Sequence, residues 1–204
     1  MPRRDYDPAQ LGPALYPLLN SVVVPRPIAW VSTRSSAGVD NLAPHSFFTV
    51  SSVVPPVVQF TSVGLKDSLR NARATGEFVV AVCTEALADV VNATGTDYPA
   101  DTSEFDACGL TREPSRLVQA SRVAESPVNL ECRVVGEHDF GGGSVVVFGE
   151  VVWAAVDEAV LQDDRPEIRL LRPVSRLGAD EWGAVGEVTD RKRVPYADLA
   201  PGRA

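Results

Sequence analysis

Apolar positions along this chain recur mainly at the two-residue spacing of β-strands. Residues 128–134 alternate strictly between apolar and polar side chains, which predicts a half-buried strand with its polar side toward solvent. Those polar positions are Asn129, Glu131 and Arg133. Short apolar runs predict further strands at 57–63 and 77–83, and the nearly continuous run 145–156 predicts a strand covered on both faces.

Two segments rich in prolines or glycines modify this pattern. Residues 20–33 favour β-structure, but Pro25 and Pro27 cannot donate to a strand ladder, so we expect this segment at a sheet edge or bulge. Residues 141–143 are three glycines directly before the long apolar run, which favours a hairpin. The alternative is a phosphate-binding loop, but neither the G-x-x-x-x-G-K-[ST] nor the G-x-G-x-x-G pattern surrounds them.

Only a few segments show helical spacing. Residues 65–75 carry an apolar stripe at i, i+4 and i+7, and Gly76 is a suitable end for that helix. Shorter helices or helical turns are predicted within 87–95 and 102–108. Many strands, few helices and no regular strand–helix alternation favour a mainly β, antiparallel barrel over a doubly wound sheet.

Composition and charge narrow the class of protein. A chain of 204 residues with 45% hydrophobic residues can bury the core of one compact domain. The net charge of −8 and the pI of about 4.8 argue against a nucleic-acid-binding protein. The most apolar stretch is too short to span a bilayer as a helix, and prolines interrupt the N-terminal region where a signal peptide would need an apolar core. We therefore expect a cytoplasmic protein without a membrane partner.

The cysteines predict neither a disulfide framework nor a zinc site. Cys83, Cys108 and Cys132 are odd in number and share no metal-type spacing. Cys83 and Cys132 lie in apolar or alternating patterns, so we interpret them as buried structural thiols.

Two polar segments could hold a flat, phosphorylated ligand. Residues 41–46 combine a proline-fixed turn with small side chains, which lets backbone N–H and C=O groups approach a ring edge closely. Lys66, Asp67 and Ser68 open the predicted helix, where free N–H groups and a lysine suit an anion such as phosphate. The alternative is that Asp67 or Ser68 only caps the helix.

A series of further short motifs runs through the chain in a particular order. They are Tyr16-Pro17, Pro25 to Thr33, Gly38, Asn41 to Phe48, Pro55-Pro56, Lys66-Asp67-Ser68, Asn71, Glu104-Phe105, Gly109-Leu110, Glu125 to Val128, Glu131-Cys132, Gly149-Glu150-Val151 and Arg176-Leu177-Gly178. Their order and spacing over residues 15–183 resemble the flavin reductase-like, FMN-binding split-barrel proteins. The resemblance implies an antiparallel split barrel of Greek-key type at 15–183, an N-terminal arm at 1–14 and a C-terminal tail at 184–204.

The same resemblance implies a set of cofactor-binding residues. It places Asn41, Ala43, Pro44 and Ser46 beside the isoalloxazine and ribityl chain of FMN. It also places Ser51, Ser52, Lys66, Asp67 and Ser68 around the phosphate, with Arg26 as a further phosphate contact.

His45 lies within the predicted flavin loop and has two interpretations. It could face a bound nicotinamide or alter the proton affinity of the ring, because histidine titrates near neutral pH. We favour the other interpretation, a polar loop residue that makes one local hydrogen bond. His138 is expected to be a surface turn residue.

The resemblance implies an enzyme, an oxidoreductase that reduces flavin with NADH or NADPH as a transient hydride donor. The reduced flavin would pass to a partner monooxygenase or another electron acceptor. A non-catalytic FMN-binding module, a sensor or an electron-transfer protein on the same fold is the alternative. We also expect a homodimer in which the outer face of residues 145–156 packs against a second subunit. No metal site is expected.

Overall fold

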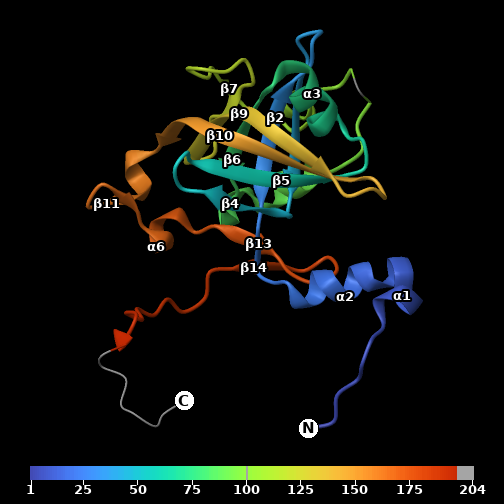
Figure 1. Cartoon of the computed structure of the whole chain (residues 1–204). Coiled ribbons are helices and arrows are strands. Elements are labelled where there is room, and N and C mark those ends of the chain that lie inside the picture. The colour runs from blue at the N-terminus through green and yellow to red at the C-terminus, as the bar shows by residue number, and fades with distance from the viewer. Residues whose placement is uncertain (100, 197–204) are drawn as a thin grey trace.

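The computed structural model describes residues 1–99 and 101–196 and is organised around one curved antiparallel sheet (Figure 1). Its seven strands are ordered β3-β2-β6-β9-β10-β5-β4. They are β2 (Ala29–Arg34), β3 (Asp40–His45), β4 (Phe48–Ser52), β5 (Val57–Val63), β6 (Glu77–Val82), β9 (Val128–Asp139) and β10 (Ser144–Val156). The predicted mainly β, antiparallel fold is confirmed, and so are the strands at 57–63, 77–83 and 145–156. The last of these is not covered on both faces as predicted, because residues 151–156 are half-buried or exposed.

The curvature of the sheet brings its two edge strands, β3 and β4, close together. The end of β3 leads directly toward β4, and Thr61 of β5 donates its backbone N–H to the carbonyl of Phe47 at 2.9 Å. The hairpin between β9 and β10 turns at the three glycines 141–143, which all have positive φ. The hairpin interpretation of those glycines is therefore confirmed.

One buried core lies between this sheet and α3 (Asp67–Thr75). Phe60 and Phe78 meet there edge to face, with ring centroids 5.2 Å apart. Gly149 makes room for this pair, because a Cβ at that position would lie 2.2 Å from Cζ of Phe78. Leu69 of α3 is buried against the same cluster, whereas Leu65 lies before the helix and is 64% exposed.

A second core lies under three short helices, η2 (Glu85–Leu87), α4 (Ala88–Ala93) and α5 (Glu104–Ala107). These elements confirm the helices predicted within 87–95 and 102–108. Trp30 of β2 and Phe105 of α5 are fully buried in this core. Trp30 donates its indole N–H to Oγ1 of Thr94 at 2.8 Å, which ties the end of α4 to the sheet.

The segment 20–33 differs from the prediction of one edge strand. Its first residues belong to α2 (Leu15–Val22), and β2 lies inside the sheet between β3 and β6. Pro25 and Pro27 precede β2, so that every N–H of this strand remains available for pairing. Pro27 belongs instead to β1 (Arg26–Pro27), which pairs with β13 (Val174–Arg176) in a separate small sheet.

The alternation at 128–134 correctly predicts a strand but not which residues it buries. Glu131 is fully buried, and its carboxylate accepts two hydrogen bonds from the guanidinium of Arg122 and two from the backbone N–H groups of Arg116 and Leu117. Burial alone raises the pKa of Glu131, but these hydrogen bonds outweigh it and lower the pKa. The expected solvent-facing side is covered because the loop around 115–123 folds over it.

The remaining elements form the periphery. They are α1 (Pro8–Leu11), η1 (Gly12–Ala14), β7 (Arg112–Glu113), β8 (Arg122–Val123), η3 (Glu158–Val160), β11 (Leu161–Gln162), β12 (Arg165–Pro166), α6 (Ile168–Leu171) and β14 (Trp182–Ala184). In Figure 1, α1, α2, β13 and β14 lie together below the curved sheet. Among the described residues no helix is long and apolar enough to cross a membrane, and no group of His, Cys, Asp or Glu could hold a metal ion.

Two cysteines predicted to be buried and one histidine predicted at the surface can be located in the structure. Cys83 and Cys132 are buried, as predicted, and burial raises the pKa of both thiols. His138 is exposed, but it lies in β9 rather than in a turn and stacks edge to face on Phe140.

Candidate functional site

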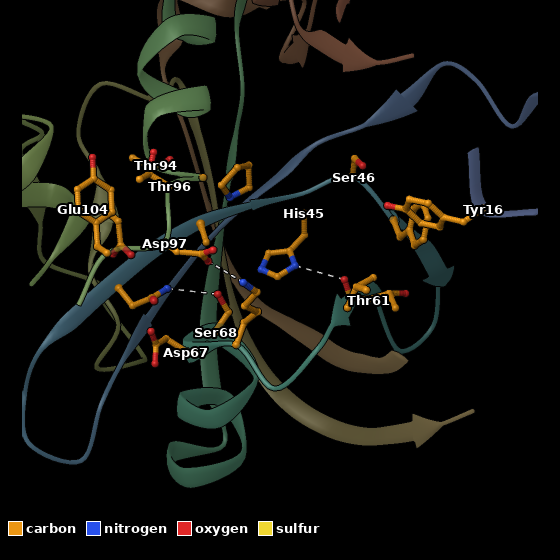
Figure 2. Close-up of a pocket in the computed structure, with 18 residues that line it drawn as sticks. Tyr16, His45, Ser46, Thr61, Asp67, Ser68, Thr94, Thr96, Asp97 and Glu104 are labelled. Atoms are coloured by element: carbon orange, nitrogen blue, oxygen red, sulfur yellow. Dashed lines mark hydrogen bonds and ion pairs between the residues drawn. The ribbon is translucent and has the colours of Figure 1, made fainter. Parts of the chain in front are cut away.

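A cavity of about 260 Å³ opens between the end of β3, the start of α3 and the loop after α4 (Figure 2). It brings together most of the residues that the sequence analysis assigned to flavin. Those that line it are Asn41, Ala43, Pro44, Ser46, Lys66, Asp67 and Ser68. The structure thus gathers two segments that lie some twenty residues apart in the chain.

The start of α3 lines this cavity through Lys66, Asp67 and Ser68. Lys66 is the N-cap in extended conformation, and the first backbone hydrogen bond of the helix runs from Arg70 N–H to the Lys66 carbonyl at 3.0 Å. The N–H groups of the three preceding residues therefore have no partner within the helix, at its positive end. Neither Asp67 nor Ser68 caps the helix, so that alternative is wrong: Asp67 pairs with Arg70.

Ser68 connects the two predicted segments directly. Its side chain is buried, and its Oγ accepts a hydrogen bond from Nδ2 of Asn41 at 3.2 Å. Asn71, one turn later in α3, donates to Oγ1 of Thr33 on β2 at 3.2 Å. These two bonds fix the helix start against β2 and β3.

Lys66 reaches across the mouth of the cavity to the opposite wall. Its ammonium lies 2.6 Å from Oδ1 of Asp97, and this pair is solvent-exposed, at 56% for the lysine and 86% for the aspartate side chain. Hydrogen bonding to Lys66 lowers the pKa of Asp97. An anion at the helix start would compete with Asp97 for the ammonium.

The sequence analysis missed most of this opposite wall. The lining residues that it did not assign to flavin include Tyr16, Phe47, Thr61, Thr94, Gly95, Thr96, Asp97, Tyr98 and Glu104. Gly95 packs closely on β3, because a Cβ at this position would lie 3.4 Å from Cγ of Pro44. Glu104 belongs to a motif of the sequence resemblance, which was the available signal, whereas nothing around Asp97 distinguishes it in the sequence.

Glu104 fastens the two walls to each other. Its carboxylate accepts a hydrogen bond from the backbone N–H of Leu42 at 2.8 Å, on the open edge of β3. Burial raises the pKa of this carboxyl, while the bond from Leu42 acts in the opposite direction. Nearby, Arg112 bridges Asp40 at the start of β3 and Asp106 in α5.

Three predicted residues lie outside the cavity. The buried guanidinium of Arg26 donates to the backbone carbonyls of Asn20, Val23 and Leu177, which secures α2 and the β13–β14 turn. Burial, followed by repulsion from Arg176, lowers the pKa of Arg26. Ser51 and Ser52 lie in β4, where Ser51 donates to Oε1 of Gln59. The structure does not bring these three residues to the cavity.

His45 ends β3 at the centre of the cavity lining (Figure 2). Its Nδ1 lies 3.3 Å from the carbonyl oxygen of Thr61, and its ring packs on Phe60 with centroids 4.8 Å apart. The local hydrogen bond that we favoured is present, although His45 lies in a strand and not in a loop. Burial lowers the pKa of His45 to about 4, which argues against the other interpretation, in which the ring titrates near neutral pH.

Comparison with known proteins decides the family. Residues 21–171 match the model of the flavin reductase like domain. The chain belongs to the flavin reductase-like family. It is 40% identical over 84% of its length to an uncharacterized protein of Halalkalibacterium halodurans, of which the match covers 87%. It is 35% identical, over 84% of the chain and 89% of the relative, to the uncharacterized protein YwrF of Bacillus subtilis.

Solved structures confirm the split-barrel fold of this flavin reductase-like chain. It superposes on nitrilotriacetate monooxygenase component B from Bacillus cereus with a TM-score of 0.88 and 28% identity, covering 94% of this chain and all of that one. The match to 2-nitrobenzoate 2-nitroreductase NbaA of Pseudomonas fluorescens has a TM-score of 0.89 and 29% identity over 98% of this chain and 100% of that chain. A putative flavin reductase with a split barrel domain from Shewanella frigidimarina shares the fold at a TM-score of 0.83 and 22% identity, over 96% of this chain and 100% of that chain.

The residues present in this flavin reductase-like chain fit an FMN group. The helix start and Lys66 suit the phosphate, and the small side chains of Ala43 and Ser46 leave room for a ring. In the described part of the chain, Nε2 of His45 is a buried polar atom without a hydrogen-bond partner, which a ligand could satisfy.

Proposed function

We propose that this chain binds FMN in the cavity and reduces it with NADH or NADPH. The observation that carries the proposal is the meeting of the α3 N-terminus, Lys66 and the small-residue end of β3 around one cavity. In this role the chain would supply reduced flavin to a partner oxygenase or another electron acceptor. The structural similarity to a monooxygenase component and to a nitroreductase supports a role in electron supply.

The protein's part in this activity is binding and orientation. Free N–H groups at the start of α3 would bind the phosphate. The ammonium of Lys66 would leave Asp97 and bind the phosphate as well. Asn41 and Ser68 hold β3 against α3, which keeps the ring-binding edge in place. FMN, when bound, supplies the hydride-accepting chemistry, so no protein nucleophile is needed.

Hydride transfer requires one ring face to remain open to the donor. The cavity is open to solvent, and the side chains of Lys66 and Asp97 in its lining are exposed, so a donor could approach a bound ring from this side.

We also propose a homodimer. Large apolar side chains are exposed around α2 and the β4–β5 turn, and β10 is only half-buried over 151–156. They include Tyr16, Leu19, Val22, Val23, Val53 and Val54. Exposed apolar surface of this kind is typical of an interface between subunits. Light scattering should give about twice the chain mass of 21.8 kDa, and a monomer at micromolar concentration would contradict the proposal.

The central experiment is an anaerobic titration of FMN-loaded protein with NADH and, separately, with NADPH. Rapid bleaching of the flavin absorption band supports the reductase. Bound FMN that neither nucleotide bleaches supports the non-catalytic module, and protein that binds no FMN contradicts both.

A further inference from the structure

His45 lines the cavity and carries a buried ring nitrogen without a hydrogen-bond partner among the described residues. A carbonyl oxygen only accepts, so the contact between Nδ1 and the Thr61 carbonyl at 3.3 Å requires that Nδ1 carries the proton. In the neutral ring Nε2 then has a free lone pair. This atom is closed to solvent and has no partner within the described residues.

The surroundings of His45 keep its ring neutral. The ring packs on Phe60, and burial lowers the pKa of the imidazole to about 4. The Thr61 bond opposes that shift without reversing it. At neutral pH, Nε2 is therefore an acceptor and cannot act as a donor toward an anionic group.

An unsatisfied buried acceptor favours any ligand that brings a donor to it. We propose that His45 is a ligand-contacting residue whose unprotonated Nε2 accepts a hydrogen bond from an N–H or O–H group of the flavin. The inference rests on the proposed function, because the flavin supplies the donor. The flavin has two kinds of hydrogen-bond donor that could reach this atom, its ring imide N–H and its ribityl hydroxyls.

A small movement of the cavity wall has to accompany this contact, because Nε2 is closed to solvent in the structure. The Lys66–Asp97 pair at the mouth is exposed, so opening it costs little free energy. A phosphate that binds Lys66 would compete with Asp97 and so favour opening of that pair.

Nitrogen-15 NMR of the histidine side chains tests the inference without any measurement of activity. The chain has two histidines, so His138→Gln identifies the remaining ring signals as those of His45. We expect the Nδ1–H tautomer in flavin-free protein at pH 7, and a change of the Nε2 shift toward a hydrogen-bonded acceptor when FMN is added. A proton on Nε2 in the flavin-free protein overturns the inference.

Two flavin analogues separate the donor sources. Lumiflavin keeps the ring imide but lacks the ribityl chain, and 3-methyl-FMN lacks the imide N–H. An Nε2 change with lumiflavin but not with 3-methyl-FMN assigns the imide, and the reverse result assigns a ribityl hydroxyl. A change that occurs only when NAD⁺ joins FMN-loaded protein overturns the flavin contact.

His45→Phe provides the binding test, because it keeps an aromatic ring against Phe60 and removes the acceptor. We expect a loss of about tenfold in FMN affinity, the usual size of one hydrogen bond, and no loss for the analogue that lacks the assigned donor. Equal loss for both ligands overturns the inference. FMN binding with an unchanged Nε2 signal also overturns it while leaving the proposed function intact, whereas absence of FMN binding by the native protein removes both.

Discussion

The two walls of the cavity are built differently. The first, β3 with the start of α3, is made of regular elements joined by buried bonds such as that between Asn41 and Ser68. The second, described at 94–99 and 101–107, consists of irregular segments and the one-turn helix α5, and is held by long-range contacts such as Trp30 to Thr94 and Glu104 to Leu42. The first wall carries the groups that suit a flavin. The second wall lies opposite and sets the width of the cavity.

The largest expected effect comes from blocking the first wall. Ser46→Leu places a bulky side chain in the cavity lining and should exclude the flavin ring by overlap, with a loss of FMN affinity greater than about a hundredfold. Ser51→Leu is the matched control, because Ser51 lies on β4 outside the cavity. Absorption spectra and circular dichroism should show a colourless but folded Ser46→Leu protein. Normal FMN affinity in this variant would place the flavin elsewhere.

Removing the charge at the start of α3 should have the next largest effect. Lys66→Ala is expected to weaken FMN by ten- to hundredfold, or about 1.5 to 3 kcal/mol, and to leave riboflavin almost unchanged. The chain contains one other lysine, Lys192, so Lys192→Ala is the control for a general loss of charge. Calorimetry with both ligands checks the result, and an equal loss for FMN and riboflavin would make Lys66 structural.

Glu104 tests whether the second wall is held as the structure indicates. Glu104→Ala leaves the N–H of Leu42 without its partner and should lower the free energy of unfolding by roughly 1 to 3 kcal/mol. Glu104→Gln retains an acceptor oxygen and should recover part of this loss. Glu125→Ala is the exposed counterpart, because Glu125 also accepts a backbone N–H, from Thr111, where water can replace it. Urea unfolding of the three variants makes the comparison, and equal losses for Glu104→Ala and Glu125→Ala would contradict it.

His45 gives the folded protein a predictable response to pH. Its folded pKa of about 4 lies below the unfolded value of about 6.5, so the unfolded chain binds a proton that the folded chain does not. Stability should therefore fall as the pH drops through this range, with about 1.2 kcal/mol lost from His45 between pH 7 and 5.5. His45→Phe should lack this component and His138→Gln should keep it, as measured by urea unfolding. Equal slopes in both variants would show that His45 is not buried as a neutral ring.

The two walls also differ in how far the sequence could predict them. The first depends on short-range features: the sequence predicted the helix with Lys66 at its start, whereas the segment around Pro44, predicted as a turn, forms strand β3. The second depends on pairings such as Glu104 with Leu42, which only the folded chain brings together. The same limit explains Glu131: alternation predicted its strand, but its burial depends on Arg122 and a covering loop. Arg26 shows the opposite error, because a residue suited to phosphate is used instead to secure backbone carbonyls.

The smallest expected effect concerns the contact that joins the walls at the mouth. Asp97 competes with an incoming phosphate for Lys66, so Asp97→Asn should bind FMN more tightly than the native protein. The pair is largely exposed, and exposed ion pairs contribute less than about 1 kcal/mol, so the gain should not exceed about fivefold. It should also shrink as salt concentration rises, because screening weakens the pair that the phosphate must displace. Riboflavin, which has no phosphate, should bind both proteins equally. A weaker FMN complex in Asp97→Asn would mean that Asp97 positions Lys66 for the phosphate rather than competing with it, and the second wall would then share in ligand recognition.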